Sequence, residues 1–239
     1  MIIIPAIDLK KGQAVRLKQG DFSRSTVYSS DPVEVALRWK EAGARRIHII
    51  DLDGSVSGAP RNREVIKRIV EAVDVPIELG GGIRDLFTVE AYIQMGIKKV
   101  ILGTAALKDP EVVHRACMLF PGQIIIGIDA KDGMVAVEGW TVATKQPAIE
   151  FARRFEEYNL DSIIYTDINR DGMETGVNIE STRKLAESVR IPVIASGGVS
   201  SLKDITGLKQ VEQSGIIGVI IGKALYTGAI DLKEAIKLS

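Results

Sequence analysis

The second half of this sequence repeats the first. Residues 3–15 read IIPAIDLKKGQAV and residues 124–136 read IIIGIDAKDGMVA, and each is an apolar run that ends in Ile-Asp and continues to a Gly. Three further landmarks recur in the same order, each near the end of an apolar run. The matched pairs are Asp8 with Asp129, Asp51 with Asp167, Gly81 with Gly197, and Gly103 with Gly222. A repeat of this length is too long for a solenoid unit and indicates a duplicated half-domain.

Short apolar runs alternate with longer amphipathic segments along the whole chain. The apolar runs are rich in β-branched residues, which is typical of parallel strands buried on both faces. We expect strands near residues 2–7, 47–51, 76–79, 99–102, 124–129, 162–166, 192–195 and 217–221. We expect helices near residues 32–42, 61–72, 86–95, 110–119, 146–158, 179–189, 202–213 and 231–237. The Asp of Asp31-Pro32 and of Asp109-Pro110 is expected to cap the helix that follows it.

Strict alternation of eight strands and eight helices predicts one α/β domain over residues 1–239. The predicted fold is a single (βα)8 TIM barrel, built from two duplicated (βα)4 half-barrels at about residues 1–120 and 121–239. An open, doubly wound sheet is the alternative. The repeat favours closure, because half a barrel leaves an exposed strand edge that a second copy can cover.

Composition narrows the class of protein. Lysine plus arginine and aspartate plus glutamate both number 31, so no basic field exists to attract nucleic acid. No apolar run approaches the ~20 residues of a membrane span, and the start MIIIPAID lacks the basic residues of a signal peptide. The single Cys117 excludes an internal disulfide and is expected in the core. We therefore expect a cytoplasmic monomer without nucleic-acid or membrane partners.

Two aspartates stand at the ends of opposed strands. In a (βα)8 barrel the functional residues lie at the carboxyl ends of the strands. Asp8 ends the first strand and Asp129 ends the fifth, so their carboxylates are expected to face each other across the barrel mouth. Such a pair suits an acid and a base that move protons at two positions of one substrate. A single Asp can merely cap loop amides, but two in one duplicated context favour catalysis.

The second and sixth strands end in Asp51 and Asp167, within loops rich in Asp and Gly. Loop capping and direct participation in the site both remain open for these two residues. His48 precedes Asp51 on its strand and can point into the barrel, whereas His114 lies on an amphipathic helix and is expected at the surface. Because no His, Cys and carboxylate cluster has metal-ligand spacing, we predict no metal and no cofactor.

Glycines follow the third, fourth, seventh and eighth strands at matched positions. A glycine-rich turn leaves backbone N–H groups that can converge on an oxyanion, and barrels often bind phosphate after strands seven and eight. Any one glycine can simply permit a tight turn, but four matched ones predict two phosphate sites and a small-molecule substrate with two phosphates. The residues expected there are Gly81, Gly82, Arg84, Gly103, Thr104, Gly197, Gly198, Gly222 and Lys223.

These motifs resemble the histidine-biosynthesis barrel family, and the resemblance covers essentially the whole chain. The family contains an isomerase and a cyclase, both with paired Asp on strands one and five. Three features resemble the isomerase: Arg16 in IPAIDLKKGQAVRLKQGDF, the second Asp of DLDGSVSG at 51–58, and Gly139-Trp140 after the fifth strand. The segment IYTDINRDGMETG at 164–176 is also similar. Val142 departs from the pattern, because the family often has an acidic residue at this position.

The resemblance implies an Amadori rearrangement, which converts an aminoaldose to an aminoketose without redox or metal chemistry. It implies that Asp8 accepts a proton, that Asp129 donates one, and that Thr166 assists the site. Asp129 would then need a raised pKa. The remaining residues expected to contact the substrate are His48, Asp51, Asp167 and Trp140, whose indole can lie over the substrate or pack in the core.

Three alternatives remain open. The first is a bifunctional isomerase that also acts on phosphoribosylanthranilate. The second is the cyclase, which would need a glutaminase partner to supply ammonia. The third is a non-catalytic barrel that binds phosphosugars, which the two intact Asp disfavour.

Overall fold

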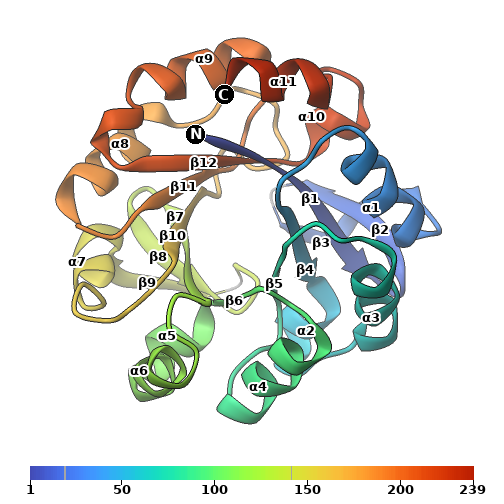
Figure 1. The fold of residues 1–239 in the computed structure, drawn as a ribbon. Coiled ribbons are helices and arrows are strands. Elements are labelled where there is room, and N and C mark those ends of the chain that lie inside the picture. Colours follow the sequence, from blue (N-terminus) through green and yellow to red (C-terminus); the bar gives the residue numbers. More distant parts are fainter. Residues whose placement is uncertain (19, 141) are drawn as a thin grey trace.

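Eight parallel strands close into a barrel at the centre of the molecule (Figure 1). The computed structural model describes residues 1–18, 20–140 and 142–239. Around the ring each strand pairs in parallel with the next, β10 pairs with β7, and β12 returns to β1. This closure confirms the predicted barrel, and the open sheet is wrong. The strands are β1 (Ile2–Lys10), β4 (Ile47–Asp51), β5 (Ile77–Gly80), β6 (Lys99–Leu102), β7 (Ile124–Lys131), β10 (Ser162–Asp167), β11 (Val193–Ser196) and β12 (Ile216–Ile221).

Helices surround the barrel as the amphipathic segments predict (Figure 1). They are α1 (Pro32–Glu41), α3 (Arg63–Ala72), α4 (Leu86–Met95), α6 (Pro110–Leu119), α7 (Ala148–Arg153), α8 (Ile179–Ser188), α9 (Leu202–Gln210) and α11 (Leu232–Leu238). Helix α7 is shorter than the predicted 146–158, because residues up to Pro147 belong to a strand and turns follow Arg153. Short helices α2 (Leu52–Ser57), α5 (Thr104–Lys108) and α10 (Lys223–Tyr226) follow three of the strands, and η1 (Glu212–Ser214) follows α9.

Only one of the two predicted aspartate caps forms. Asp31 Oδ1 accepts from the Val33 backbone N–H at 3.0 Å, as expected. Asp109 makes no side-chain cap, so that expectation is wrong. The reason is its place between two helices: Asp109 also ends α5, where its N–H donates to Ala105 O.

Two antiparallel hairpins extend the barrel where no strand is predicted. Strands β2 (Gln13–Lys18) and β3 (Asp21–Ser29) follow β1, while β8 (Met134–Val137) and β9 (Val142–Pro147) follow β7. They occupy equivalent places in the two halves of the repeat. The hairpins meet over the barrel mouth, because the Cα of Gly20 lies against the Trp140 ring without room for a Cβ.

The core has two apolar layers. One lies between strands and helices and includes Cys117, which is buried as predicted, whereas His114 is exposed as predicted. The other fills the barrel interior with isoleucines, namely Ile4, Ile101, Ile125, Ile164, Ile194 and Ile220. At the amino ends of the strands a charged layer lies inside the barrel, made of Arg46, Glu78, Lys99 and Asp161. The isoleucines therefore lie between this charged layer and much of the other end of the barrel, where the strands have their carboxyl ends.

Equivalent hydrogen bonds recur in the two halves. Asn62 Nδ2 donates to Asp51 Oδ1 at 2.7 Å, and Asn178 Nδ2 donates to Asp167 Oδ2 at 2.6 Å. This likeness supports the division into half-barrels near residues 1–120 and 121–239, which stays a prediction.

In the part of the chain that the structure describes, no helix is long and apolar enough to cross a membrane.

Candidate active site

A cavity of about 220 Å³ opens at the carboxyl ends of the strands. Most residues expected from the sequence line it, drawn from both halves of the repeat. They are Asp8, His48, Gly81, Gly82, Arg84, Gly103, Thr104, Asp129, Trp140, Thr166, Gly197, Gly198, Gly222 and Lys223. Asp51 and Asp167 are not among the lining residues. The repeat therefore converges on one shared cavity.

Asp8 is held by an arginine from the adjoining hairpin. Arg16 Nη1 donates to Asp8 Oδ2 at 2.8 Å, and Nη2 donates to the Ala6 carbonyl at 2.7 Å. The guanidinium also lies 5.3 Å from the Tyr226 ring centre. Burial opposes the charge of Arg16, but Asp8, with Tyr226 and Asp171, outweighs it and raises the pKa of Arg16. The Asp8 carboxylate thus faces the cavity beside a fixed cation.

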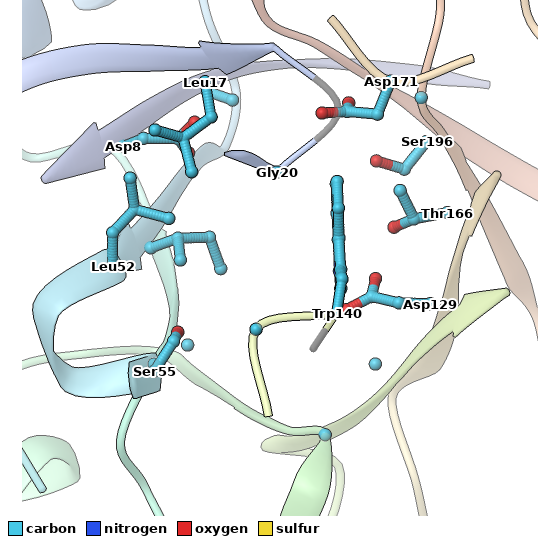
Figure 2. Close-up of a pocket in the computed structure, with 18 of the residues that line it drawn as sticks. Asp8, Leu17, Gly20, Leu52, Ser55, Asp129, Trp140, Thr166, Asp171 and Ser196 are labelled. Carbon is cyan, nitrogen blue, oxygen red and sulfur yellow. The ribbon is translucent and has the colours of Figure 1, made fainter. Parts of the chain in front are cut away.

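Asp129 lies across the cavity in a different environment (Figure 2). Burial raises the pKa of Asp129, while hydrogen bonds from Trp140 and Thr166 and the charge of His48 act in the opposite direction. Figure 2 shows the Trp140 indole beside Asp129, with Thr166 close by and Asp8 on the other side of the cavity. A desolvated carboxyl with a raised pKa is suited to act as an acid.

Asp171 is a third aspartate in the cavity, and the sequence interpretation missed it. It follows β10 in the loop before α8, and Figure 2 shows it on the same side as Thr166. Burial raises the pKa of Asp171 to about 7, with Asp8 adding to the rise and Arg16 opposing it. The available signal was its place in the segment INRDG at 168–172, which directly follows a strand end.

His48 reaches the cavity from the interior of the barrel. It lies on β4, pairs in register with Glu78 of β5, and is 8% exposed. Its Nδ1 lies 2.7 Å from Glu78 Oε1. Since Nδ1 is engaged and the ring lines the cavity, Nε2 is the ring nitrogen available to the site.

The two pairs of glycine turns have matching geometry. Gly81 and Gly82 have φ of 102° and 73°, and Gly197 and Gly198 have φ of 90° and 86°, which favours glycine at all four. Each first glycine presses on the backbone carbonyl of the strand-end Asp, Asp51 or Asp167, so that a Cβ would collide with it. The turns are therefore held close to the preceding strand ends.

Gly103 and Gly222 are the N-cap residues of helices α5 and α10, so neither helix has a side-chain cap. Thr104 Oγ1 accepts from the Glu138 N–H at 3.1 Å. Lys223 Nζ lies 2.9 Å from Glu174 Oε2 and 3.2 Å from the Gly172 carbonyl. Arg84 packs against Gly58 at the end of α2. Each half thus provides a glycine-lined pocket with a cation beside it, Arg84 or Lys223.

Asp51 and Asp167 accept hydrogen bonds from the loops that follow β4 and β10. Asp51 is fully buried, and its oxygens accept from the backbone N–H groups of Gly54, Arg61 and Asn62. Asp167 accepts from the Asn169 N–H at 2.9 Å. Of the two interpretations left open, loop capping accounts for these hydrogen bonds. The contact of Asp51 and Asp167 with substrate stays a prediction.

Trp140 projects into the cavity and is not a core residue. Its backbone has φ of 71°, an uncommon value for a large side chain, and its ring rests on Gly20 of the other hairpin.

No group of three or more His, Cys, Asp or Glu side chains within residues 1–18, 20–140 and 142–239 is arranged to hold a metal ion.

Fold and site define a class: a (βα)8 barrel whose mouth holds opposed carboxyls in one cavity lined by two sets of glycine turns. A family model described as "Histidine biosynthesis protein" matches residues 2–231. The chain belongs to this family.

Relatives from several bacteria match over the full chain. The chain is 61% identical to a protein of Syntrophus aciditrophicus, aligned over 100% of this chain and 99% of the relative. It is 58% identical to one of Geobacter sulfurreducens and 57% identical to one of Trichlorobacter lovleyi, each over 100% of this chain and 98% of the relative. All three are named 1-(5-phosphoribosyl)-5-((5-phosphoribosylamino)methylideneamino)imidazole-4-carboxamide isomerase.

Proposed function

We propose that this protein is an isomerase of histidine biosynthesis. It converts the bis-phosphorylated ribotide named in its relatives from the aminoaldose to the aminoketose form, by an Amadori rearrangement. The observation that carries this proposal is the placement of Asp8 and Asp129 on opposite sides of one cavity, between two glycine-lined pockets. The relatives all carry the isomerase name, so the cyclase is not favoured.

The reaction needs an acid and a base at different positions. Protonation of the ribose ring oxygen breaks its bond to C1′ and opens the sugar to a Schiff base. A base then removes the proton from C2′, and the electron pair shifts to give an enolamine. Loss of the C2′ hydroxyl proton and protonation at C1′ complete the ketose, so no atom is gained or lost.

Asp8 is the base in this proposal. Arg16 pairs with its carboxylate at 2.8 Å, and a paired carboxylate is the form that accepts a proton. Asp129 is the acid, because burial raises its pKa. Thr166 and Trp140 hydrogen-bond Asp129 and hold its orientation. Asp171, with a pKa raised to about 7, is a second carboxyl that can hold a proton near neutral pH.

The two phosphates occupy the two halves of the mouth. One is expected at Gly81, Gly82, Gly103 and Thr104, and the other at Gly197, Gly198 and Gly222. The backbone N–H groups of such turns suit an anion, and Arg84 and Lys223 add charge. A substrate held at both ends lies across the line between Asp8 and Asp129.

Turnover of the purified protein tests this function directly. The bis-phosphorylated ribotide and phosphoribosylanthranilate are assayed in parallel, without added metal or ammonia. Turnover of the ribotide alone is expected. Turnover of both would indicate the bifunctional enzyme, and turnover of neither would contradict the proposal.

Replacing Asp8→Asn tests the base. We expect kcat/KM to fall by about 10²- to 10⁴-fold, the range for a general base. Asp74→Asn is the matched control, since it removes an exposed carboxylate that pairs only with Lys40 in the part of the chain described. An Asp8→Asn protein with full turnover would remove Asp8 from the mechanism.

The names of the relatives indicate a small phosphorylated substrate. A monomeric state, the lack of macromolecular partners and a cytoplasmic location remain predictions. Light scattering at several concentrations measures the first of these.

A further inference from the structure

A buried glutamate lies directly behind His48. The Glu78 side chain is fully inaccessible to solvent and comes from the second residue of β5, in the charged layer inside the barrel. Its Oε1 lies 2.7 Å from His48 Nδ1, and its Oε2 lies 3.2 Å from Arg46 Nη1. A buried carboxylate is costly unless both oxygens have partners, and here each oxygen has one.

The contacts continue away from the cavity. Arg46 Nη1 also lies 3.3 Å from Asp161 Oδ2, and Lys99 Nζ lies 2.5 Å from Asp161 Oδ1. These groups come from the starts of β4, β6 and β10. The chain of charges thus runs from His48 at the cavity floor to the amino-terminal end of the barrel. Glu78 is the member that touches the histidine.

We propose that Glu78 is a positioning residue for the reaction, which holds the His48 ring by Nδ1 so that its Nε2 is presented to the carboxyls of the cavity. The inference rests on the isomerase function proposed above. Glu78 touches no part of the cavity itself, because it is absent from the residues that line it. It therefore acts through His48.

The consequence for the cavity is electrostatic. Asp8, Arg16, Asp129 and Asp171 face His48 from the cavity side, and Glu78 with Arg46 stands behind it. The charge of His48 lowers the pKa of both Asp129 and Asp171, against the larger effect of burial. A carboxylate holds the Nδ1–H of the ring more tightly than a neutral amide does. Replacing the carboxylate weakens the hold on the ring and with it the opposition to the two carboxyls, so both carboxyls would keep their protons to higher pH.

The pH dependence of kcat/KM measures this effect. The basic limb reports loss of the proton from the acid, so Glu78→Gln is expected to move that limb to higher pH. A shift of about half a pH unit or more is expected for removal of one nearby charge. Gln is nearly isosteric and still accepts from Nδ1, so the ring has room to stay in place.

Asp161→Asn is the matched control. It removes one carboxylate charge from the same interior layer but does not contact His48 in the part of the chain described. We expect its basic limb to stay at the wild-type position. An equal shift in both variants would overturn the proposal, because it would then reflect the charge of the whole layer. In a His48→Asn background, Glu78→Gln should produce no further shift.

Nitrogen NMR of the imidazoles supplies a readout that does not require activity. The chain has only two histidines, and a His114→Gln variant assigns their signals. We expect His48 Nδ1 to carry a proton at neutral pH in the wild-type protein. An Nδ1 without a proton would overturn the proposal even if Glu78→Gln fails to fold.

The outcomes separate this inference from the proposed function. If the wild-type protein does not turn over the ribotide, the proposed function fails. If it does, and Glu78→Gln leaves the basic limb unmoved, the positioning role fails alone.

Discussion

Three aspartates of the cavity have the same side chain and different surroundings. Asp8 is paired with Arg16, Asp129 is half-buried beside Trp140 and Thr166, and Asp171 is half-buried near Asp8. Desolvation opposes a negative charge, whereas an adjacent cation favours it. The surroundings thus raise the pKa of Asp129 and Asp171 and place a cation beside Asp8, a pattern common in acid–base enzymes.

Asp171→Asn is expected to stabilise the protein at alkaline pH. The folded-state pKa of Asp171 is raised to about 7, so its contribution to stability is full below about pH 4 and is lost as pH rises through 7. Asn avoids that loss. We expect the free energy of unfolding at pH 8 to exceed the wild-type value by about 2 kcal/mol, allowing for screening in an open cavity.

Urea unfolding of both proteins at pH 5 and pH 8 measures the difference. The gain should be larger at pH 8 and accompanied by lower turnover. A gain of equal size at the two pH values would show that Asp171 ionises normally in the folded protein.

The strand-end loops are alike in both halves, but their aspartates accept different numbers of hydrogen bonds. Asp51 accepts from three backbone N–H groups and from Asn62 Nδ2, while Asp167 accepts from the Asn169 N–H and from Asn178 Nδ2. Buried donors that lose their acceptor are destabilising. The first loop therefore depends more on its aspartate than the second.

Asp51→Ala and Asp167→Ala form a matched comparison of the two halves. We expect Asp51→Ala to lower the free energy of unfolding by about 3 kcal/mol and Asp167→Ala by roughly half as much. Chemical denaturation measures both values. Equal losses would mean that the additional backbone bonds of Asp51 contribute little.

The elements themselves were only partly predictable. The barrel strands have continuous apolar runs because both faces are buried, and this pattern revealed all eight. The β2–β3 and β8–β9 hairpins are only partly buried and mix apolar with polar residues, and they were missed. They form because the barrel strands β1 and β7 continue beyond the rim and offer an edge for pairing.

At the scale of the whole molecule, closure depends on contacts between the halves. β6 pairs with β7, and β12 pairs with β1, across the two boundaries of the repeat. A separate half would expose both strand edges and the apolar interior. Unpaired edges of this kind favour association with a complementary edge.

Separately produced segments 1–120 and 121–239 are expected to associate when refolded together and to recover turnover. Sedimentation and the ribotide assay measure these two properties. A cut between residues 60 and 61 is the control, because it divides a βα unit and should recover less. Two segments that stay apart in solution would contradict the predicted division.

The sequence by itself determined the eight-unit barrel, the opposed positions of Asp8 and Asp129, and the matched glycine turns. These depend on local signals, namely apolar periodicity and the residue types that end each strand, and the repeat doubled every signal. Tertiary structure alone decided that the pKa values of Asp129 and Asp171 are raised, that Asp51 and Asp167 accept hydrogen bonds from loop amides, and that Glu78 lies behind His48. Burial and charge depend on neighbours in space, and these neighbours lie on different strands or in loops far apart along the chain.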